Sequence, residues 1–489
     1  MNSVMSLDDQ SLEKHFAKFR KNVIGNGLIH DGNAIIYADW TASGRFYQPI
    51  EDFISNDIGP LIANTHTEAS FTGSTMTRLY HEAQQNIKSH VNANQDDSLI
   101  CAGAGMTTVV NKFQRILGLK IPEQYANQIK IKEHDKPVVF ITHMEHHSNQ
   151  TTWEECAVTV IRIPENSEGL PDENAFNQLL LDYVERPLKI GSFTACSNVT
   201  GIKIDYKKLA RLMHQHNGYC FIDFSASAPY VEINMHPEDP LERLDAVMFS
   251  PHKFLGGPGS SGVLVFNQSL YKNKIPDHPG GGTVTWTNPW GKHRFYDDIE
   301  VREDGGTPGF LQTIRTALCI KVKNEMGIEN IRLREKELVN ILYEGLSKIP
   351  KLQILHKQHK NRLCIISFYI PEIHFNLIVR LLSDRFGIQS RGGCSCAGTY
   401  GHILLGVDEA TSQSITCQID EGNLSRKPGW IRISLHPTST DDEANFIVDS
   451  ITKIESNISE WESDYEFDTS IGDFLPKIKA QRTLSLSDF

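Results

Sequence analysis

The sequence predicts an α/β protein in which a large, doubly wound, mostly parallel α/β/α domain is followed by a smaller C-terminal α+β domain. Short apolar and β-branched runs alternate with stretches of helical periodicity as far as Phe266, as in parallel sheets covered by helices on both faces. Polar residues directly follow several of these runs, at the carboxyl ends where such sheets bind ligands. A long helix expected over Gly309–Met326 marks the change of domain.

The length of the chain also favours two domains. At 489 residues it exceeds the size at which one hydrophobic core stops growing. We expect an N-terminal segment that packs with the small domain (1–33), a large domain (34–308), a small domain (309–462) and an acidic tail (463–489).

The composition excludes several classes of partner. The net charge of -12, without a long basic block, argues against nucleic acid or an anionic membrane. No apolar run approaches the roughly 20 residues that span a bilayer, and the first residues lack the features of a signal peptide. Nine thinly spread cysteines do not resemble a disulfide framework. We therefore expect a cytoplasmic protein with reduced thiols.

The first part of the chain contains a candidate anion site. A helix is expected over Ser11–Asn22, a strand over Ala34–Asp39 and a helix over Met76–Val91. The apolar run Ser98–Ala102 then enters the turn Gly103-Ala104-Gly105, after which apolar residues recur at helical spacing. A helix N-terminus behind a glycine turn presents free N–H groups to an anion. A tight connection without a ligand is the alternative.

A histidine-rich segment follows the next strand. Pro137–Thr142 is a β-branched run that ends in His143-Met144-Glu145-His146-His147-Ser148-Asn149. Histidines and a glutamate are typical metal ligands, but a HExxH helix is absent, and neighbouring residues of an extended segment point to opposite faces. We rank an aromatic platform above a metal site, with a solvated loop as the alternative.

The later strands of the large domain place a carboxylate and an amine at their ends. Strands are expected over Val158–Ile163, Ile190–Ala195, Tyr219–Phe224, Ala246–Phe249 and Gly262–Phe266, with a helix over Asp205–His216. Asp223 ends one of these strands, and a buried carboxylate needs a partner. Lys253 lies between the last two strands. A surface turn is the simplest interpretation of such a lysine, whereas a buried lysine of lowered pKa forms Schiff bases.

The small domain carries two cysteines on a glycine-flanked loop. Its expected elements are strands over Leu363–Tyr369 and Trp430–Leu435 and helices over Phe375–Phe386 and Asp441–Ile454. Between them lies Ser390-Arg391-Gly392-Gly393-Cys394-Ser395-Cys396-Ala397-Gly398. In an extended loop, residues two apart point to the same side, so we expect both thiols on one side of this loop. A metal site made by these two cysteines has little support, because a second pair is missing.

Together, Ser250-Pro251-His252-Lys253, the upstream Asp223 and the Glu145–Asn149 segment resemble the class V, fold-type I pyridoxal-phosphate enzymes, and most closely the cysteine desulfurases and selenocysteine lyases. The resemblance covers about Tyr37–Ile454, with the order of motifs kept. It implies pyridoxal 5′-phosphate (PLP) as the cofactor, a homodimer and no metal.

The resemblance also implies roles for the residues around the cofactor. Lys253 matches the lysine that carries PLP, and Asp223 matches the carboxylate that keeps the pyridine nitrogen protonated. His146 matches a catalytic histidine stacked on the ring. The other implied contacts are Asn198 near the phenolic oxygen, His252 beside the lysine, Ser250, Gly105, Met106 and Thr107 at the phosphate, and Thr283, donated by the other subunit.

On the substrate side, Arg432 matches the arginine that binds the substrate carboxylate, and Arg391 matches a second family arginine. Cys396 falls at the nucleophilic cysteine. The resemblance therefore implies removal of sulfur from L-cysteine, giving alanine and a persulfide on Cys396, with a protein as a possible sulfur acceptor. The alternatives are an aminotransferase or other PLP-dependent lyase acting on a different amino acid, with Cys396 not catalytic, and a regulatory protein on a decayed scaffold.

Four features depart from the family pattern. Ala226 replaces a usual glutamine, and Met106 replaces a common hydroxyl in the phosphate turn. Cys394 is an extra thiol, and the insertion Leu405–Gly429 is longer than expected. These departures leave the cofactor assignment in place and bear on the substrate.

Overall fold

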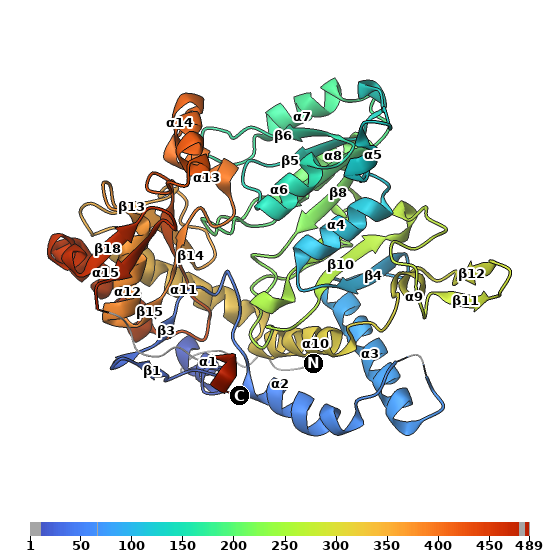
Figure 1. Cartoon of the computed structure of the whole chain (residues 1–489), viewed down its shortest axis with the longest axis horizontal. Helices are drawn as coiled ribbons and strands as arrows, with labels where there is room; N and C mark the ends of the chain where they lie inside the picture. The colour runs from blue at the N-terminus through green and yellow to red at the C-terminus, as the bar shows by residue number, and fades with distance from the viewer. Residues whose placement is uncertain (1–10, 66, 479–484, 489) are drawn as a thin grey trace.

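The computed structural model describes residues 11–65, 67–478 and 485–488. A large sheet with its helices occupies the right of Figure 1, and the small domain with α12 (Phe375–Phe386) and α15 (Asp441–Trp461) lies at the left. The predicted fold class, a doubly wound α/β domain followed by a smaller α+β domain, is confirmed.

The large sheet is mostly parallel, with one reversed strand. Its order is β4-β10-β9-β8-β7-β5-β6. Neighbours from β9 to β6 run parallel, whereas β10 is antiparallel to both β9 and β4. The strands are β4 (Asp97–Ala102), β5 (Val138–Ile141), β6 (Thr159–Arg162), β7 (Lys189–Thr194), β8 (Tyr219–Asp223), β9 (Ala246–Phe249) and β10 (Gly262–Asn267).

Apolar strands bury both faces of this sheet. Phe221 of β8 packs with α4 (Met106–Ile116) and α6 (His147–Glu154), whereas its neighbour Ile222 packs with α7 (Glu173–Asp182) and α8 (Tyr206–Gln215). Successive side chains point to opposite faces, so a strand covered on both sides reads as a continuous apolar run. This is why periodicity located these strands so closely.

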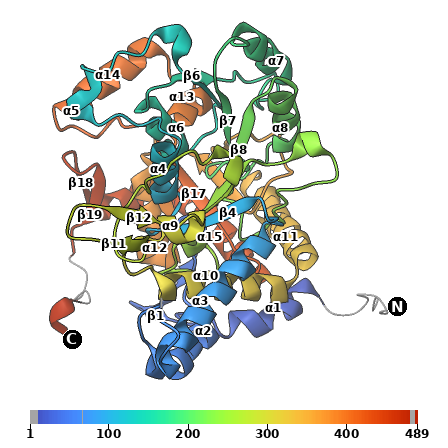
Figure 2. The same ribbon diagram turned by 90° about the vertical axis from the view of Figure 1, so that its right-hand side faces the viewer.

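Two long helices lead from the large to the small domain. In α10 (Phe310–Met326), Ile314 and Ala317 pack with Met76 of α3 (Phe71–His90), and the two helices lie together in both views (Figures 1 and 2). Helix α11 (Ile328–Leu346), which the sequence did not reveal, carries Leu338 and Leu342 into the core of the small domain. The boundary before residue 309 stays a prediction, and the helix that follows it packs on the large domain.

The small domain is built on the antiparallel sheet β13-β14-β17-β16, which packs with α12 and α15. Its strands are β13 (Gln353–Ile354), β14 (Ile365–Tyr369), β16 (Arg391–Gly393) and β17 (Trp430–Ser434). The strand β3 (Ile36–Tyr37) pairs with β15 (Ile388–Gln389), and Ile36 belongs to the small-domain core. The segment just after residue 34 therefore lies with the small domain, although we assigned it to the large one.

The described segments near the two ends of the chain contact the small domain. Helix α1 (Leu12–Arg20) contacts the small domain through Arg20, which donates to Glu443 at 2.7 and 2.8 Å. The expected acidic tail contains the hairpin β18 (Tyr465–Asp468) and β19 (Asp473–Pro476), whose Phe474 packs against His374. Part of that tail, 479–484 and 489, lies outside the described residues.

The remaining helices and hairpins are short. The insertion Leu405–Gly429 begins at the last residue of α13 (Gly398–Leu405) and contains α14 (Glu409–Asp420) and the loop that leads to β17. The hairpin β11 (Val284–Thr287) and β12 (His293–Phe295) projects at the right of Figure 1. The other elements are β1 (Ile29–His30), β2 (Asn33–Ala34), α2 (Gln48–Asp52), α5 (Glu123–Ala126) and α9 (Ile299–Glu303). Within the described ranges, every helix is too short or too polar to cross a bilayer.

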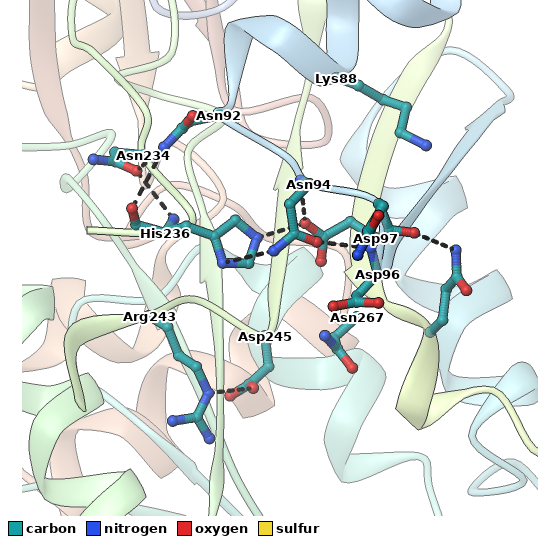
Figure 3. A network of polar contacts seen from close by, with 12 residues as sticks. Lys88, Asn92, Asn94, Asp96, Asp97, Asn234, His236, Arg243, Asp245 and Asn267 are labelled. Atoms are coloured by element: carbon teal, nitrogen blue, oxygen red, sulfur yellow. Dashed lines mark hydrogen bonds and ion pairs between the residues drawn. The ribbon is translucent and has the colours of Figure 1, made fainter. Parts of the chain in front are cut away.

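A polar network occupies the edge of the large sheet opposite the carboxyl ends of its parallel strands (Figure 3). Asp97 accepts hydrogen bonds from His236 at 2.6 Å and from the Asn94 N–H at 2.9 Å. Asp245 accepts from His214 and from the Cys220 N–H, both at 2.8 Å. These hydrogen bonds attach the loop before β9 to the first residues of β4 and β8.

Candidate active site

A cavity of 190 Å³ lies at the carboxyl ends of the parallel strands, between the two domains. Among the described residues, it is lined by all the predicted site residues except Gly105 and Thr283: Met106, Thr107, His146, Asn198, Asp223, Ser250, His252, Lys253, Arg391, Cys396 and Arg432. Side chains separated by up to 326 positions in the sequence are therefore brought to one place.

Lys253 ends a single helical turn that directly follows β9. Burial lowers the pKa of its amine to about 8, partly opposed by the negative charge of Asp223. The neighbouring His252 donates from Nδ1 to the Ala104 carbonyl at 2.8 Å. Lys253 therefore presents an amine that loses its proton near neutral pH, on a turn fixed to the glycine loop.

Asp223 stands at the end of β8, where its Oδ1 accepts the Ser225 N–H at 2.8 Å. Burial raises the pKa of this carboxyl, and the hydrogen bonds from Ser225 and the charge of Lys253 lower it. A buried carboxylate of this kind is stabilised by a cationic partner. The Asp223 side chain is therefore suited to hold a protonated ring nitrogen.

The turn before α4 forms a cradle together with hydroxyl groups from α4 itself, from α6 and from the segments that follow β8 and β9. The Ser250 Oγ accepts the Met106 N–H at 2.9 Å and lies 3.3 Å from the Ser225 Oγ. The Thr107 Oγ1 lies 2.6 Å from the Ser148 Oγ. A Cβ added at Gly105 would come within 3.1 Å of Ser250, so glycine keeps the cradle open. Free N–H groups of a helix start and several hydroxyls are typical of a phosphate site.

Only one of the three neighbouring histidines lines the cavity. Burial lowers the pKa of His146 to about 3, with a further contribution from the charge of Lys253, so its ring is neutral. Glu145 fixes this segment by accepting from the Thr142 hydroxyl at 2.7 Å and the Thr194 N–H at 3.0 Å. His143 turns away and hydrogen bonds to the Gly169 carbonyl. The geometry supports a platform role for His146.

Two arginines from adjacent strands share one carboxylate. Arg391 of β16 and Arg432 of β17 are paired in the sheet register. The Asp39 carboxylate accepts from Arg432 Nη2 at 2.6 Å and from Arg391 Nε at 3.0 Å. The Arg432 Nε and the Thr41 Oγ1, both buried beside the cavity, have no hydrogen-bond partner among the described residues. Two donors are thus free for a ligand.

The loop between β16 and α13 is a tight turn. Ser395 and Cys396 have φ angles of 52° and 56°, in the left-handed region, so the argument from an extended loop was wrong. Cys396 is exposed and lines the cavity, whereas Cys394 packs against the hydrophobic core. The two thiols therefore have different surroundings.

Comparison with known proteins identifies the family. The family model described as aminotransferase class-V matches residues 36–446, most of the chain. The chain belongs to the class-V aminotransferases. A probable cysteine desulfurase of Staphylococcus aureus (strain Mu50 / ATCC 700699) is 26% identical over 371 residues, which are 75% of this chain and 84% of that protein. One from Staphylococcus epidermidis (strain ATCC 12228 / FDA PCI 1200) is 27% identical over 371 residues, 74% of this chain and 83% of that protein.

Solved structures of class-V relatives show the same fold. The apo structure of a cysteine desulfurase from Thermococcus onnurineus NA1 superposes with a TM-score of 0.72 at 19% identity, covering 90% of this chain and 98% of that one. A cysteine desulfurase from Escherichia coli gives a TM-score of 0.70 at 19% identity, covering 91% and 98%. These likenesses establish the fold alone.

Class-V aminotransferases depend on PLP, and the residues that line the cavity fit this cofactor. A buried carboxyl at Asp223, an amine of low pKa at Lys253 and the glycine cradle at Gly105 match the ring nitrogen, the aldehyde and the phosphate of PLP. The neutral ring of His146 suits a stacking position. The class-V family thus makes this protein a PLP-dependent enzyme.

Thr283 is a predicted site residue that lies outside the cavity. It lies just before β11, where its hydroxyl donates to the Gly280 carbonyl at 2.6 Å. It does not line the cavity of its own chain, so its donation across a dimer stays a prediction.

Sequence reasoning missed several residues of this class-V site. Asp39 ends an apolar run, a signal similar to that of Asp223, and Thr41 follows two residues later. Ser225 and Cys196 also line the cavity, and Ala226 occupies the place of the usual glutamine. Nothing local distinguishes a lining serine or threonine from one in an ordinary loop.

Proposed function

We propose that this protein is a PLP-dependent cysteine desulfurase that converts L-cysteine to alanine and leaves the sulfur as a persulfide on Cys396. The observation that carries the proposal is that Cys396 lines the same cavity as Lys253 and Arg432. The substrate C–S bond breaks, an S–S bond forms at Cys396, and a proton replaces sulfur on the substrate carbon. No outside oxidant is needed.

The cofactor would be held by Lys253, Asp223, His146 and Asn198, with Ser250, His252 and the turn Gly105-Met106-Thr107 at its phosphate end. When bound, PLP supplies an electron sink that weakens bonds to the substrate α-carbon. The Lys253 amine, whose pKa is about 8, can take and return a proton close to neutral pH.

Arg432 binds the substrate carboxylate in this proposal, and Arg391 contributes a second positive charge at the more exposed side. Asp39 holds both guanidinium groups in place. The Cys396 thiolate attacks the substrate sulfur, and its exposure lets an acceptor protein or small thiol remove the sulfur afterwards.

A homodimer is part of the proposal. A second hollow of 630 Å³, lined mainly by small residues of 101–104 and 259–261, lies beside the cradle and shares His252 with it. The projecting β11–β12 hairpin carries Trp286 and Trp290, which are 47% and 82% exposed. Such aromatic side chains suit a subunit interface, which would bring Thr283 to the partner's cradle.

A cytoplasmic location is also proposed, because all nine cysteines are unpaired. The function is tested by assaying the PLP-loaded protein with L-cysteine and a panel of other amino acids. We expect alanine and sulfide in equal amounts from cysteine, in the presence of a reductant. A keto acid formed from another amino acid, with equal rates for the parent and for Cys396→Ala, would instead identify an aminotransferase.

A further inference from the structure

The second histidine of the pair, His147, binds the loop that carries Cys396. Its backbone N–H donates to the Cys396 carbonyl at 2.8 Å. Its ring Nε2 accepts the Gly398 N–H, also at 2.8 Å. One residue of α6 therefore holds the loop at two points, both just after the Cys396 Cα in the chain.

The ring contact requires a particular state of the imidazole. A nitrogen that accepts an N–H carries no proton of its own, so the ring is neutral with its hydrogen on Nδ1. Burial lowers the pKa of His147, partly opposed by the nearby Glu154, and so favours this form. A Cβ at Gly398 would come within 3.2 Å of Nε2, which is closer than usual, so glycine permits the approach.

The loop needs such a restraint. Two successive non-glycine residues, Ser395 and Cys396, are left-handed, with φ of 52° and 56°. Backbones of this kind persist only where the surroundings fix them. Asn198 donates to the Ser395 carbonyl at 2.7 Å and the Trp430 indole to the Ser395 hydroxyl at 3.2 Å. Both of these contacts act on Ser395, whereas His147 acts on Cys396 and on the residue two positions later.

We propose that His147 is a positioning residue that fixes the Cys396 thiol for attack on the substrate sulfur. The inference rests on the proposed function. His147 does not line the cavity that holds the reacting atoms, and it acts only through the backbone of the loop. Thiol attack needs alignment, and a misplacement of about 1 Å can cost on the order of 100-fold in rate.

Three variants separate the ring contact from side-chain bulk. In His147→Gln, the Oε1 reaches about where Nε2 stands and can accept the Gly398 N–H. In His147→Asn, the oxygen stands near the Nδ1 position instead, and His147→Leu has no acceptor. We expect His147→Asn and His147→Leu to lower kcat for alanine formation roughly 10- to 100-fold, with KM and the PLP absorption spectrum unchanged. His147→Gln should stay within about threefold of the parent.

Amide hydrogen exchange on the PLP-loaded protein without substrate measures the protection of the Gly398 N–H by His147 directly. In the peptide that contains Gly398, one amide should exchange at least about tenfold faster in His147→Leu and His147→Asn, and at the parental rate in His147→Gln. His216→Leu, at a half-buried histidine at the end of α8 that hydrogen bonds to Asn177, is the matched control and should change neither exchange nor turnover.

Equal exchange or equal turnover in all three His147 variants would overturn the proposal. A changed PLP spectrum in His147→Leu would also overturn it, because the residue would then act through the cofactor side. Exchange does not depend on turnover, so a parent protein that releases no sulfur refutes the proposed function while the loop contact is still judged by the exchange data.

Discussion

The two ends of the large-sheet strands face different surroundings: one end closes on a polar network, and the other opens on the cavity that the small domain also lines. At the end of the strands shown in Figure 3, one carboxylate oxygen of Asp97 accepts hydrogen bonds from His236 and from the Asn94 N–H, and its Oδ1 has no partner among the described residues. Nearby, Asp245 accepts from His214 and from the Cys220 N–H. At the active-site end, the Thr41 hydroxyl and the Arg432 Nε remain without a partner among the described residues. A paired buried group stabilises the fold, whereas an unpaired one costs stability until a ligand binds.

The comparison predicts that substitutions at the two ends have separable effects. The active-site end should control turnover with little influence on folding. The opposite end should control folding with little influence on turnover. The following expectations run from the largest effect to the smallest.

Cys396→Ala should reduce alanine and sulfide formation from cysteine to background, a loss of more than about 1,000-fold, since the sulfur acceptor is removed. The thermal midpoint and the PLP absorption spectrum should not change, because the side chain is exposed. Cys394→Ala is the matched control and should retain most of the activity. A Cys396→Ala protein that turned over cysteine like the parent would exclude the desulfurase reaction.

Attachment of PLP to the apoprotein should depend on pH through Lys253. The neutral amine is the nucleophile, and with a pKa of about 8 its fraction rises about fifty-fold from pH 6 to pH 8 and then levels off. Borohydride trapping at a series of pH values, followed by peptide mapping, measures this rate and its site. A rate that kept rising to about pH 10 would indicate an ordinary exposed lysine, and an adduct elsewhere would refute the assignment.

Arg432→Lys should raise KM for cysteine about 10- to 100-fold, because an ammonium cannot reproduce the two-sided contact of a guanidinium with a carboxylate. Arg391→Lys, at the half-exposed partner, serves as the comparison and should raise KM less than about tenfold. Steady-state kinetics at several cysteine concentrations distinguish the two. Equal increases in KM for the two variants would place the substrate carboxylate between both arginines.

Asp97→Ala should lower the free energy of unfolding by about 2–3 kcal/mol, since it removes the buried carboxylate that accepts hydrogen bonds from His236 and from the Asn94 N–H. Turnover per folded molecule should be unchanged. Asp96→Ala, at the exposed neighbouring position, should shift stability by less than about 0.5 kcal/mol. Chemical denaturation measures both. A fall in kcat for Asp97→Ala would show that the two ends are coupled.

Thr41→Val should raise the stability of the protein and weaken its binding of cysteine. Removing a buried hydroxyl that no described residue pairs with should stabilise the protein by about 1 kcal/mol, and the lost contact should raise KM for cysteine about fivefold. Thr65→Val removes another buried hydroxyl that has no partner among the described residues, away from the cavity, and should give the stabilisation alone. Unchanged KM in Thr41→Val would remove Thr41 from the substrate contacts.

The cofactor half of the site could be predicted from the sequence, because its residues stand at the ends of strands that periodicity locates. Asp223 is the last residue of the buried strand β8, and Lys253 ends the helical turn after β9. The structure brings both side chains to one cavity. The substrate half depends on contacts between distant segments. The Asp39–Arg432 pair spans 393 positions, and the left-handed turn at Cys396 has no glycine at that residue to announce it.

The fold shows the same limit. The strands of the large sheet fell within one or two residues of their predicted bounds, since both of their faces are buried. The strand expected over Ala34–Asp39 shrinks to Ile36–Tyr37 and pairs with β15. Strand pairing between segments far apart in the sequence is decided by tertiary packing, which local propensity does not contain.

The most direct test of the account follows one sulfur atom. The PLP-loaded protein would be given about one equivalent of cysteine labelled at sulfur, without a reductant, and the label located by peptide mapping. We predict about one label per chain in the peptide that contains Cys396, matched by one alanine, kept in Cys394→Ala and absent in Cys396→Ala. Label that remained in free cysteine, or that bound equally well in Cys396→Ala, would contradict the assignment of Cys396 as the sulfur acceptor.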